Sequence, residues 1–83
     1  MYDVELSKIA EKQLYKLNKD LQIRIISTLE RCRVRPYVHV KKLVSSSYFR
    51  LRVGKYRIII DIIQNKLIVF VIKIEHRKKI YKH

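Results

Sequence analysis

The sequence has very little of what flexible linkers and disulfide frameworks are made of. Its 83 residues include one glycine, one proline, one cysteine and no tryptophan. This composition leaves little room for a flexible linker or a low-complexity segment. A chain this short builds one compact core, so we expect a single domain over residues 1–83. Cys32 has no cysteine to pair with in the chain, and we expect it to be a small buried apolar side chain.

Acidic residues are also scarce. Lys and Arg number 20 against seven Asp and Glu, which gives a formal net charge of +13. Positive charges in such excess repel one another, which indicates an anionic partner. Nucleic acid is the first candidate, because cations that neutralise phosphates release counterions. An anionic membrane surface or an acidic protein would also satisfy the charge, and a merely solubilising surface is the plainest alternative. The carboxylates are scattered without metal-ligand spacing, so we expect no metal and no other cofactor.

Long hydrophobic runs are absent as well. The longest, such as residues 67–72, are far shorter than the roughly 20 residues that span a bilayer as a helix. Residues 1–6 carry acids and are too short for a signal peptide. We therefore expect a cytoplasmic protein that has no membrane partner.

The beginning of the chain is patterned as a strand followed by two helices. Residues 1–6 alternate between apolar and polar, which is typical of a half-buried strand. Ser7 is placed to cap a helix over residues 8–17, and Asn18 to cap a second helix. Apolar residues of the second helix recur at helical spacing, at Leu21, Ile25, Leu29 and Cys32. The break between the two amphipathic helices, at residues 17–19, is short, so we expect them to form a helical hairpin.

The rest of the chain predicts strands. Residues 33–40 contain Pro36 and are expected to form a loop, and Ser45, Ser46 and Ser47 a polar turn. Strands are expected over residues 48–53, 56–63 and 66–75, with turns at 54–55 and 64–65. Runs joined by two-residue turns indicate an antiparallel meander. The fold class is therefore α+β, with a helical hairpin packed on one face of an antiparallel sheet. The order is β-α-α-β-β-β, and the other face is left for solvent or a ligand.

The strand over residues 48–53 carries the most informative pattern. Alternation puts Phe49, Leu51 and Val53 toward the helices, and Tyr48, Arg50 and Arg52 on the open face. Two arginines on one strand face repel each other unless an anion lies beside them. Arg57, across the turn, is expected next to them, and three guanidiniums on one face would clamp a phosphate. The plain alternative is that these arginines only solubilise an exposed sheet face.

Two sequence motifs resemble those of the RelE/ParE superfamily of toxins. Residues 48–59, YFRLRVGKYRII, resemble its R-x-R-x-G-x-Y-R strand–turn–strand, and residues 75–81, EHRKKIY, its closing H-R-x-x-x-Y segment. An apolar strand lies between the motifs and a K-x-L step at residues 41–43 precedes them, so the resemblance spans essentially the whole chain. It implies the toxin of a toxin–antitoxin pair, bound and silenced by an acidic, RelB-like antitoxin.

The resemblance leaves two functions open. RelE-like members cleave mRNA in the ribosomal A site, whereas ParE-like members inhibit DNA gyrase and lack the catalytic residues. The working positions of the RelE-like branch match Arg50, Arg52, Arg57, Arg77 and Tyr81 of this sequence. The first two are often lysine in the family, and arginine is the poorer proton donor but still binds phosphate. The endoribonuclease is the leading hypothesis, the gyrase inhibitor is the alternative, and a plain nucleic-acid-binding module is a third.

The reaction that the resemblance implies is attack of an RNA 2′-hydroxyl on the adjacent phosphate. We expect Tyr81 to be the base, because a cationic cluster lowers the pKa of a tyrosine from its ordinary value of about 10. Arg52 and Arg57 would hold the phosphate, and Arg77 would stabilise or protonate the leaving group. These four residues form the expected catalytic set.

Other candidates have smaller expected roles. Arg50 and Tyr48 are expected to bind substrate, Tyr48 by stacking on a base, unless it is an ordinary strand aromatic. Histidine has a suitable pKa for proton transfer. However, His76 falls on the core side by alternation, His83 is the last residue of the sequence, and His39 has no evident partner.

Overall fold

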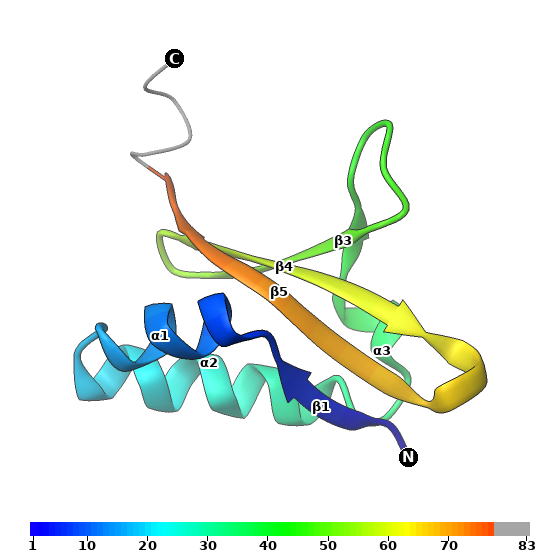
Figure 1. Ribbon diagram of the computed structural model, residues 1–83, viewed down its shortest axis with the longest axis horizontal. Coiled ribbons are helices and arrows are strands. Elements are labelled where there is room, and N and C mark those ends of the chain that lie inside the picture. The colour runs from blue at the N-terminus through cyan, green and yellow to red at the C-terminus, as the bar shows by residue number, and fades with distance from the viewer. Residues whose placement is uncertain (78–83) are drawn as a thin grey trace.

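The computed structural model describes residues 1–77, which form a helical layer and a sheet (Figure 1). In chain order the elements are β1 (Asp3–Leu6), α1 (Lys8–Tyr15), α2 (Lys19–Arg31), α3 (Pro36–His39), β2 (Lys41–Lys42), β3 (Phe49–Val53), β4 (Tyr56–Ile63), the 3-10 turn η1 (Gln64–Lys66) and β5 (Ile68–His76). The predicted α+β class and the order β-α-α-β-β-β are confirmed. Two short elements lie where no helix or strand was expected: α3 within residues 33–40, and β2 directly after it.

The strands form one sheet in the order β1-β5-β4-β3-β2. β3, β4 and β5 make the predicted antiparallel meander, and β2 adds to the outer edge of β3. β1 pairs with β5 in the parallel direction, which the alternation of residues 1–6 does not specify. The chain thus begins at one edge of the sheet, and β3 lies near the other.

Both predicted helix caps are present. The Ser7 side chain accepts a hydrogen bond from the backbone N–H of Ala10 at 3.0 Å, and Asn18 accepts one from Leu21 at 2.9 Å. The Ser7 hydroxyl also donates to the carbonyl oxygen of Ile72 in β5 at 2.6 Å, so the same residue starts α1 and ties it to the sheet. No helix within residues 1–77 is long and apolar enough to cross a membrane.

One face of the sheet is covered by α1 and α2 (Figure 1). α1 packs against β5 and β1, and α2 against β3. The helical side contributes Ala10, Leu14, Ile25, Leu29 and Cys32 to the core, and the sheet contributes mainly Leu51, Val53, Ile58, Ile60, Val69, Val71 and Ile74. Cys32 is fully buried, as predicted, and burial raises the pKa of its thiol. The opposite face of the sheet is covered by neither α1 nor α2.

A bulge in β5 reverses the inside–outside alternation of that strand. The register between β4 and β5 shifts between Ile59 and Ile60, which leaves Ile72 as the extra residue. Before the bulge the odd-numbered residues Val69 and Val71 are buried, and after it the even-numbered residue Ile74 is buried. Strict alternation would have carried Lys73 and Glu75 into the core. The bulge turns both side chains onto the uncovered face.

Candidate functional site

The uncovered face carries two rows of paired residues near the β3 end of the sheet. One row runs through Lys41, Arg50, Ile59 and Lys73, and the other through Arg52, Arg57 and Glu75. Residues paired across neighbouring strands share a face, so the structure does bring Arg50, Arg52 and Arg57 onto one face. Arg52 and Arg57 lie directly opposite each other. Two like charges so placed destabilise the sheet unless a counter-charge is near.

Glu75 supplies that counter-charge, which the sequence pattern does not predict. Its Oε1 accepts hydrogen bonds from Arg57 Nε at 3.0 Å and Nη2 at 2.7 Å, and its Oε2 lies 3.0 Å from Lys73 Nζ. Burial acts to raise the pKa of the Glu75 carboxyl, but the hydrogen bonds and charges of Lys73 and Arg57 outweigh it and leave that pKa below its usual value. Arg57 is therefore already engaged, and the predicted cluster of three guanidiniums has only two without a carboxylate partner among the described residues.

A hollow of about 280 Å³ lies beside the first row, and we refer to it as the β3 hollow. It is lined by His39, Lys41, Arg50, Leu51 and Arg52. No carboxylate lines it, so its charged groups are all cations. The sequence assigns His39 no partner, because it predicts a loop over residues 33–40. The signal that could have found it is Pro36, which stands at the first position of a helix, where its fixed φ and missing N–H are tolerated.

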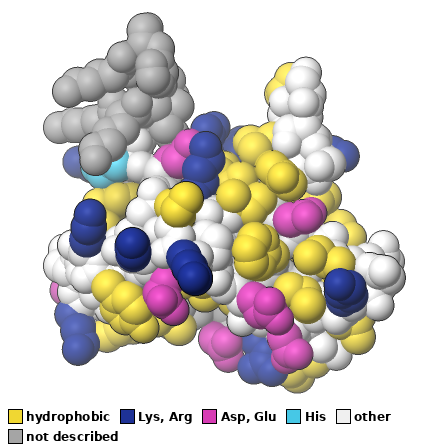
Figure 2. Space-filling view, viewed as in Figure 1, with side chains coloured by type: hydrophobic (Ala, Val, Ile, Leu, Met, Phe, Trp, Pro, Cys, Tyr) yellow, Lys and Arg dark blue, Asp and Glu magenta, His cyan; other side chains and the backbone are white. Residues whose placement is uncertain are grey.

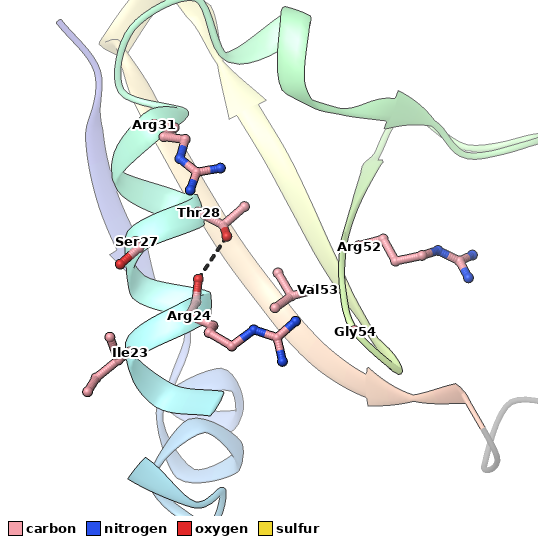
Figure 3. Close-up of a pocket in the computed structure, with 8 residues that line it drawn as sticks. All are labelled: Ile23, Arg24, Ser27, Thr28, Arg31, Arg52, Val53 and Gly54. Atoms are coloured by element: carbon pink, nitrogen blue, oxygen red, sulfur yellow. Dashed lines mark hydrogen bonds between the residues drawn. The ribbon is translucent and has the colours of Figure 1, made fainter. Parts of the chain in front are cut away.

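A second hollow, which we call the α2 groove, lies between α2 and the β3–β4 hairpin (Figure 3). Its volume is about 410 Å³, and it is lined by Ile23, Arg24, Ser27, Thr28, Arg31, Arg52, Val53 and Gly54. In Figure 3, Arg24, Thr28 and Arg31 point from α2 toward the hairpin, whereas Arg52 points from β3 away from α2. Arg52 lines both the groove and the β3 hollow, so the two meet at this residue.

Gly54 allows the hairpin to turn beside the groove. Its φ is +57°, in the left-handed region that favours glycine. A Cβ at this position would stand 3.5 Å from Nη2 and 3.7 Å from Nη1 of Arg24. The Arg24 guanidinium therefore lies close over the backbone of the turn.

The other predicted residues are distributed around this end of the sheet. Tyr48 directly precedes β3 and is 40% exposed. Arg77 follows β5, and its backbone N–H donates to the Lys55 carbonyl at 2.8 Å, which places it beside the β3–β4 turn. His76 lies at the opposite face, with its ring edge-on to Tyr56 at 4.9 Å between ring centres. Tyr81, the expected base, and His83 lie outside the described residues.

The net charge alone does not locate the site. Lys and Arg side chains are scattered over the face shown in Figure 2, among carboxylates and apolar side chains. The β3 hollow and the α2 groove differ from that surface because arginines line them and no Asp or Glu does. The arrangement can bind anions, and His39 adds a side chain of the kind that exchanges protons near neutral pH.

Comparison with known proteins gives one family match. Residues 4–81 match a family described as the ParE toxin of the type II toxin–antitoxin system parDE. The match includes the β3–β4 hairpin and extends through Arg77 to residue 81. Among curated proteins, none matches the chain.

Several solved structures share the fold. The isolated E. coli RelE toxin is 20% identical, with a TM-score of 0.80 over 92% of this chain and 84% of that one. A chain of the RelE–RelB complex of Pyrococcus horikoshii is 24% identical, with a TM-score of 0.81 over 92% and 94%. A chain of the RelB–RelE antitoxin–toxin complex of Methanococcus jannaschii is 27% identical, with a TM-score of 0.74 over 93% and 94%.

Proposed function

We propose that this chain, which belongs to the ParE toxin family of type II toxin–antitoxin systems, is a toxin that cleaves mRNA in the ribosomal A site. The observation that carries the proposal is the β3 hollow, where His39 lies with Lys41, Arg50 and Arg52. RNA cleavage needs cations that stabilise the charge developing on the phosphate, and a group that moves protons. The β3 hollow combines both at the edge of β3.

Arg50 and Arg52 are the phosphate-binding pair of the proposal. They lie two residues apart on one strand, about 7 Å along it, and neither forms an ion pair within residues 1–77. A guanidinium offers paired N–H donors that match two phosphate oxygens. Arg57 contributes less than the sequence predicted, since its Nε and Nη2 are already bound to Glu75.

Proton transfer is assigned to two residues. In the reaction a 2′-oxygen forms a bond to the adjacent phosphorus, the bond to the 5′-oxygen breaks, and a 2′,3′-cyclic phosphate results. Tyr81, as the phenolate, takes the 2′-hydroxyl proton, as the family resemblance implies. Arginine side chains keep their protons at any physiological pH, so Arg50 and Arg52 cannot supply the proton that the leaving oxygen needs. His39, when protonated, supplies it, and Arg77 stabilises the developing charge from beside the turn.

The test is cleavage of mRNA on programmed ribosomes, read by primer extension. The wild-type chain is expected to cut in the A-site codon, and Arg52→Ala and Tyr81→Phe to abolish the cut. Lys8→Ala, an exposed residue of α1, is the matched control for loss of one cation and is expected to cut. Wild-type rates in both site variants would remove these residues from the mechanism, and no cut by the wild-type chain would end the nuclease proposal.

A second candidate, inhibition of DNA gyrase, is favoured by one specific observation. The matching family is described as ParE toxins, and ParE-like members are the branch without the catalytic residues. The engagement of Arg57 by Glu75 is compatible with that branch, because it weakens the cationic cluster. Adding the purified chain to a gyrase supercoiling reaction and to a translation reaction separates the two functions. A gyrase inhibitor is expected to stop only supercoiling, and an mRNA endonuclease only translation.

An antitoxin partner belongs to the same proposal. The similar structures from P. horikoshii and M. jannaschii are complexes of RelE with RelB, and the net charge of +13 complements an acidic partner. We expect this chain to bind an acidic RelB-like antitoxin that stops its activity. Co-expression with the short acidic open reading frame next to its gene, followed by co-purification, tests this.

A further inference from the structure

The α2 groove holds two arginines, Arg24 and Arg31, that have no carboxylate partner within residues 1–77. Arg24, Thr28 and Arg31 stand at positions i, i+4 and i+7 of α2, so they share one face of the helix. That face looks toward the β3–β4 hairpin (Figure 3). The two guanidinium-bearing residues are separated by about 10 Å along the helix axis. Within residues 1–77, neither Arg24 nor Arg31 forms an ion pair.

The nearby carboxylate does not neutralise the groove. Glu30 adjoins Arg31 in sequence, yet its Oε1 lies 3.3 Å from Nη1 of Arg33. Arg33 also lies 4.0 Å from Asp3 through Nη2. The acids at this end of α2 are thus directed to Arg33, and the arginines of the groove keep their charge unopposed.

The groove continues into the β3 hollow around the edge of the sheet. β2 pairs only with Phe49 and Arg50 of β3. Of the remaining residues of β3, Arg52 and Val53 border the groove, Leu51 lines the β3 hollow, and Arg52 belongs to both depressions. Arg52 at the edge of β3 therefore links the arginines of the α2 groove to the cations of the β3 hollow.

We propose that the α2 groove binds the phosphodiester backbone of the RNA strand next to the nucleotide held in the β3 hollow. Arg24 and Arg31 each contact one phosphate, and Arg52 lies where the strand crosses the edge of β3. This inference rests on the proposed nuclease function, for which it assigns a second binding position. Such contacts position the strand and add salt-dependent affinity, and they carry no sequence information.

An RNA backbone fits the groove better than an acidic protein segment. Docked protein segments use apolar anchors that fill pockets, and among the described residues the apolar lining of the groove is limited to Ile23 and Val53. Val53 is 6% exposed, and Ile23 points away from the hairpin in Figure 3. The Thr28 hydroxyl is already committed to the Arg24 carbonyl at 2.7 Å. The two guanidiniums remain accessible, and their paired N–H donors suit phosphate oxygens.

The test is binding of a single-stranded RNA oligonucleotide with 2′-O-methyl groups, which cannot be cleaved. Affinity is measured by fluorescence anisotropy between about 50 and about 200 mM salt. The variant Arg24→Gln/Arg31→Gln is expected to bind at least tenfold more weakly. Its slope of log affinity against log salt should fall by about 1.4, since each single-strand phosphate contact contributes about 0.7. Lys8→Gln/Lys12→Gln on α1 removes the same charge and should keep the wild-type slope.

The outcomes separate this inference from the nuclease proposal. If the wild-type chain cleaves mRNA but the arginine variant keeps wild-type affinity and slope, the groove assignment is wrong and the nuclease proposal stands. The opposite result is also informative. If the wild-type chain cleaves no mRNA but the variant binds the oligonucleotide more weakly and with a smaller salt slope, the groove binds RNA and the nuclease proposal fails. A variant that binds RNA with wild-type affinity but no longer binds a poly-glutamate peptide would overturn the groove assignment in favour of an acidic protein. Both arginines are exposed, and an unchanged melting temperature confirms that the variant is folded.

Discussion

Replacing Glu75 by glutamine tests how the cations of the uncovered face are held together. The change keeps the shape of the side chain and removes the charge that Arg57 and Lys73 share. A charge-assisted hydrogen bond contributes about 1.5–3 kcal/mol. Here both Arg57 nitrogens converge on one oxygen, and the Arg57 and Glu75 side chains are 29% and 21% exposed. The expected loss is therefore at the low end, about 1.5 kcal/mol for the whole substitution.

For a chain of this size that loss corresponds to a decrease in melting temperature of about 6–12 °C. The effect should depend on pH. The pKa of Glu75 is below its ordinary value in the folded chain, so its contribution is present above about pH 4.3. It is lost as pH falls through the folded pKa. The difference between wild type and Glu75→Gln should therefore shrink between pH 6 and pH 3.

Thermal unfolding followed by circular dichroism at both pH values measures this. Glu30→Gln is the matched control, because it makes the same chemical change at a carboxylate that is 56% exposed and pairs only with Arg33. An exposed pair of this kind contributes less than about 1 kcal/mol. A decrease for Glu75→Gln no larger than that of the control, or one that is the same at both pH values, would refute the reasoning.

Three further predictions concern single side chains. His39→Gln should slow mRNA cleavage about 100-fold or more; a wild-type cleavage rate would exclude His39 as the acid. Ser7→Ala should cost about 1.5 kcal/mol in urea unfolding, more than Asn18→Ala, because it removes a cap and also the bond to the Ile72 carbonyl; equal losses would contradict this. Gly54→Ala should cost about 1 kcal/mol because φ is +57°, and an unchanged melting temperature would show that the turn relaxes.

The features that the sequence predicted correctly have local causes. Ser7 and Asn18 cap helices through their own side chains, and Gly54 turns the chain through its own φ. Each can be recognised without knowing what the segment packs against. The open-face placement of Arg50 and Arg52 likewise follows from alternation within one short strand.

The features that were missed depend on partners distant in sequence. β5 is apolar on both faces along most of its length, so its residues do not reveal that the alternation reverses at Ile72. The position of Glu75 beside Arg57 follows from that bulge. The parallel pairing of β1 is a property of the assembled sheet. His39 lines the β3 hollow at the end of α3, which forms where a loop was expected, and directly before β2.

The distribution of carboxylates determines which cations an anion can bind without displacing an internal ion pair. The ion pairs within residues 1–77 use Asp3, Glu30 and Glu75, and their cations are Arg33, Arg57 and Lys73. An anion that approaches Arg57 must compete with Glu75 for the same nitrogens. An anion at the edge of β3 or in the α2 groove displaces no internal carboxylate and relieves repulsion between neighbouring guanidiniums. The edge of β3, rather than the centre of the sheet, is therefore where we expect the first phosphates to bind.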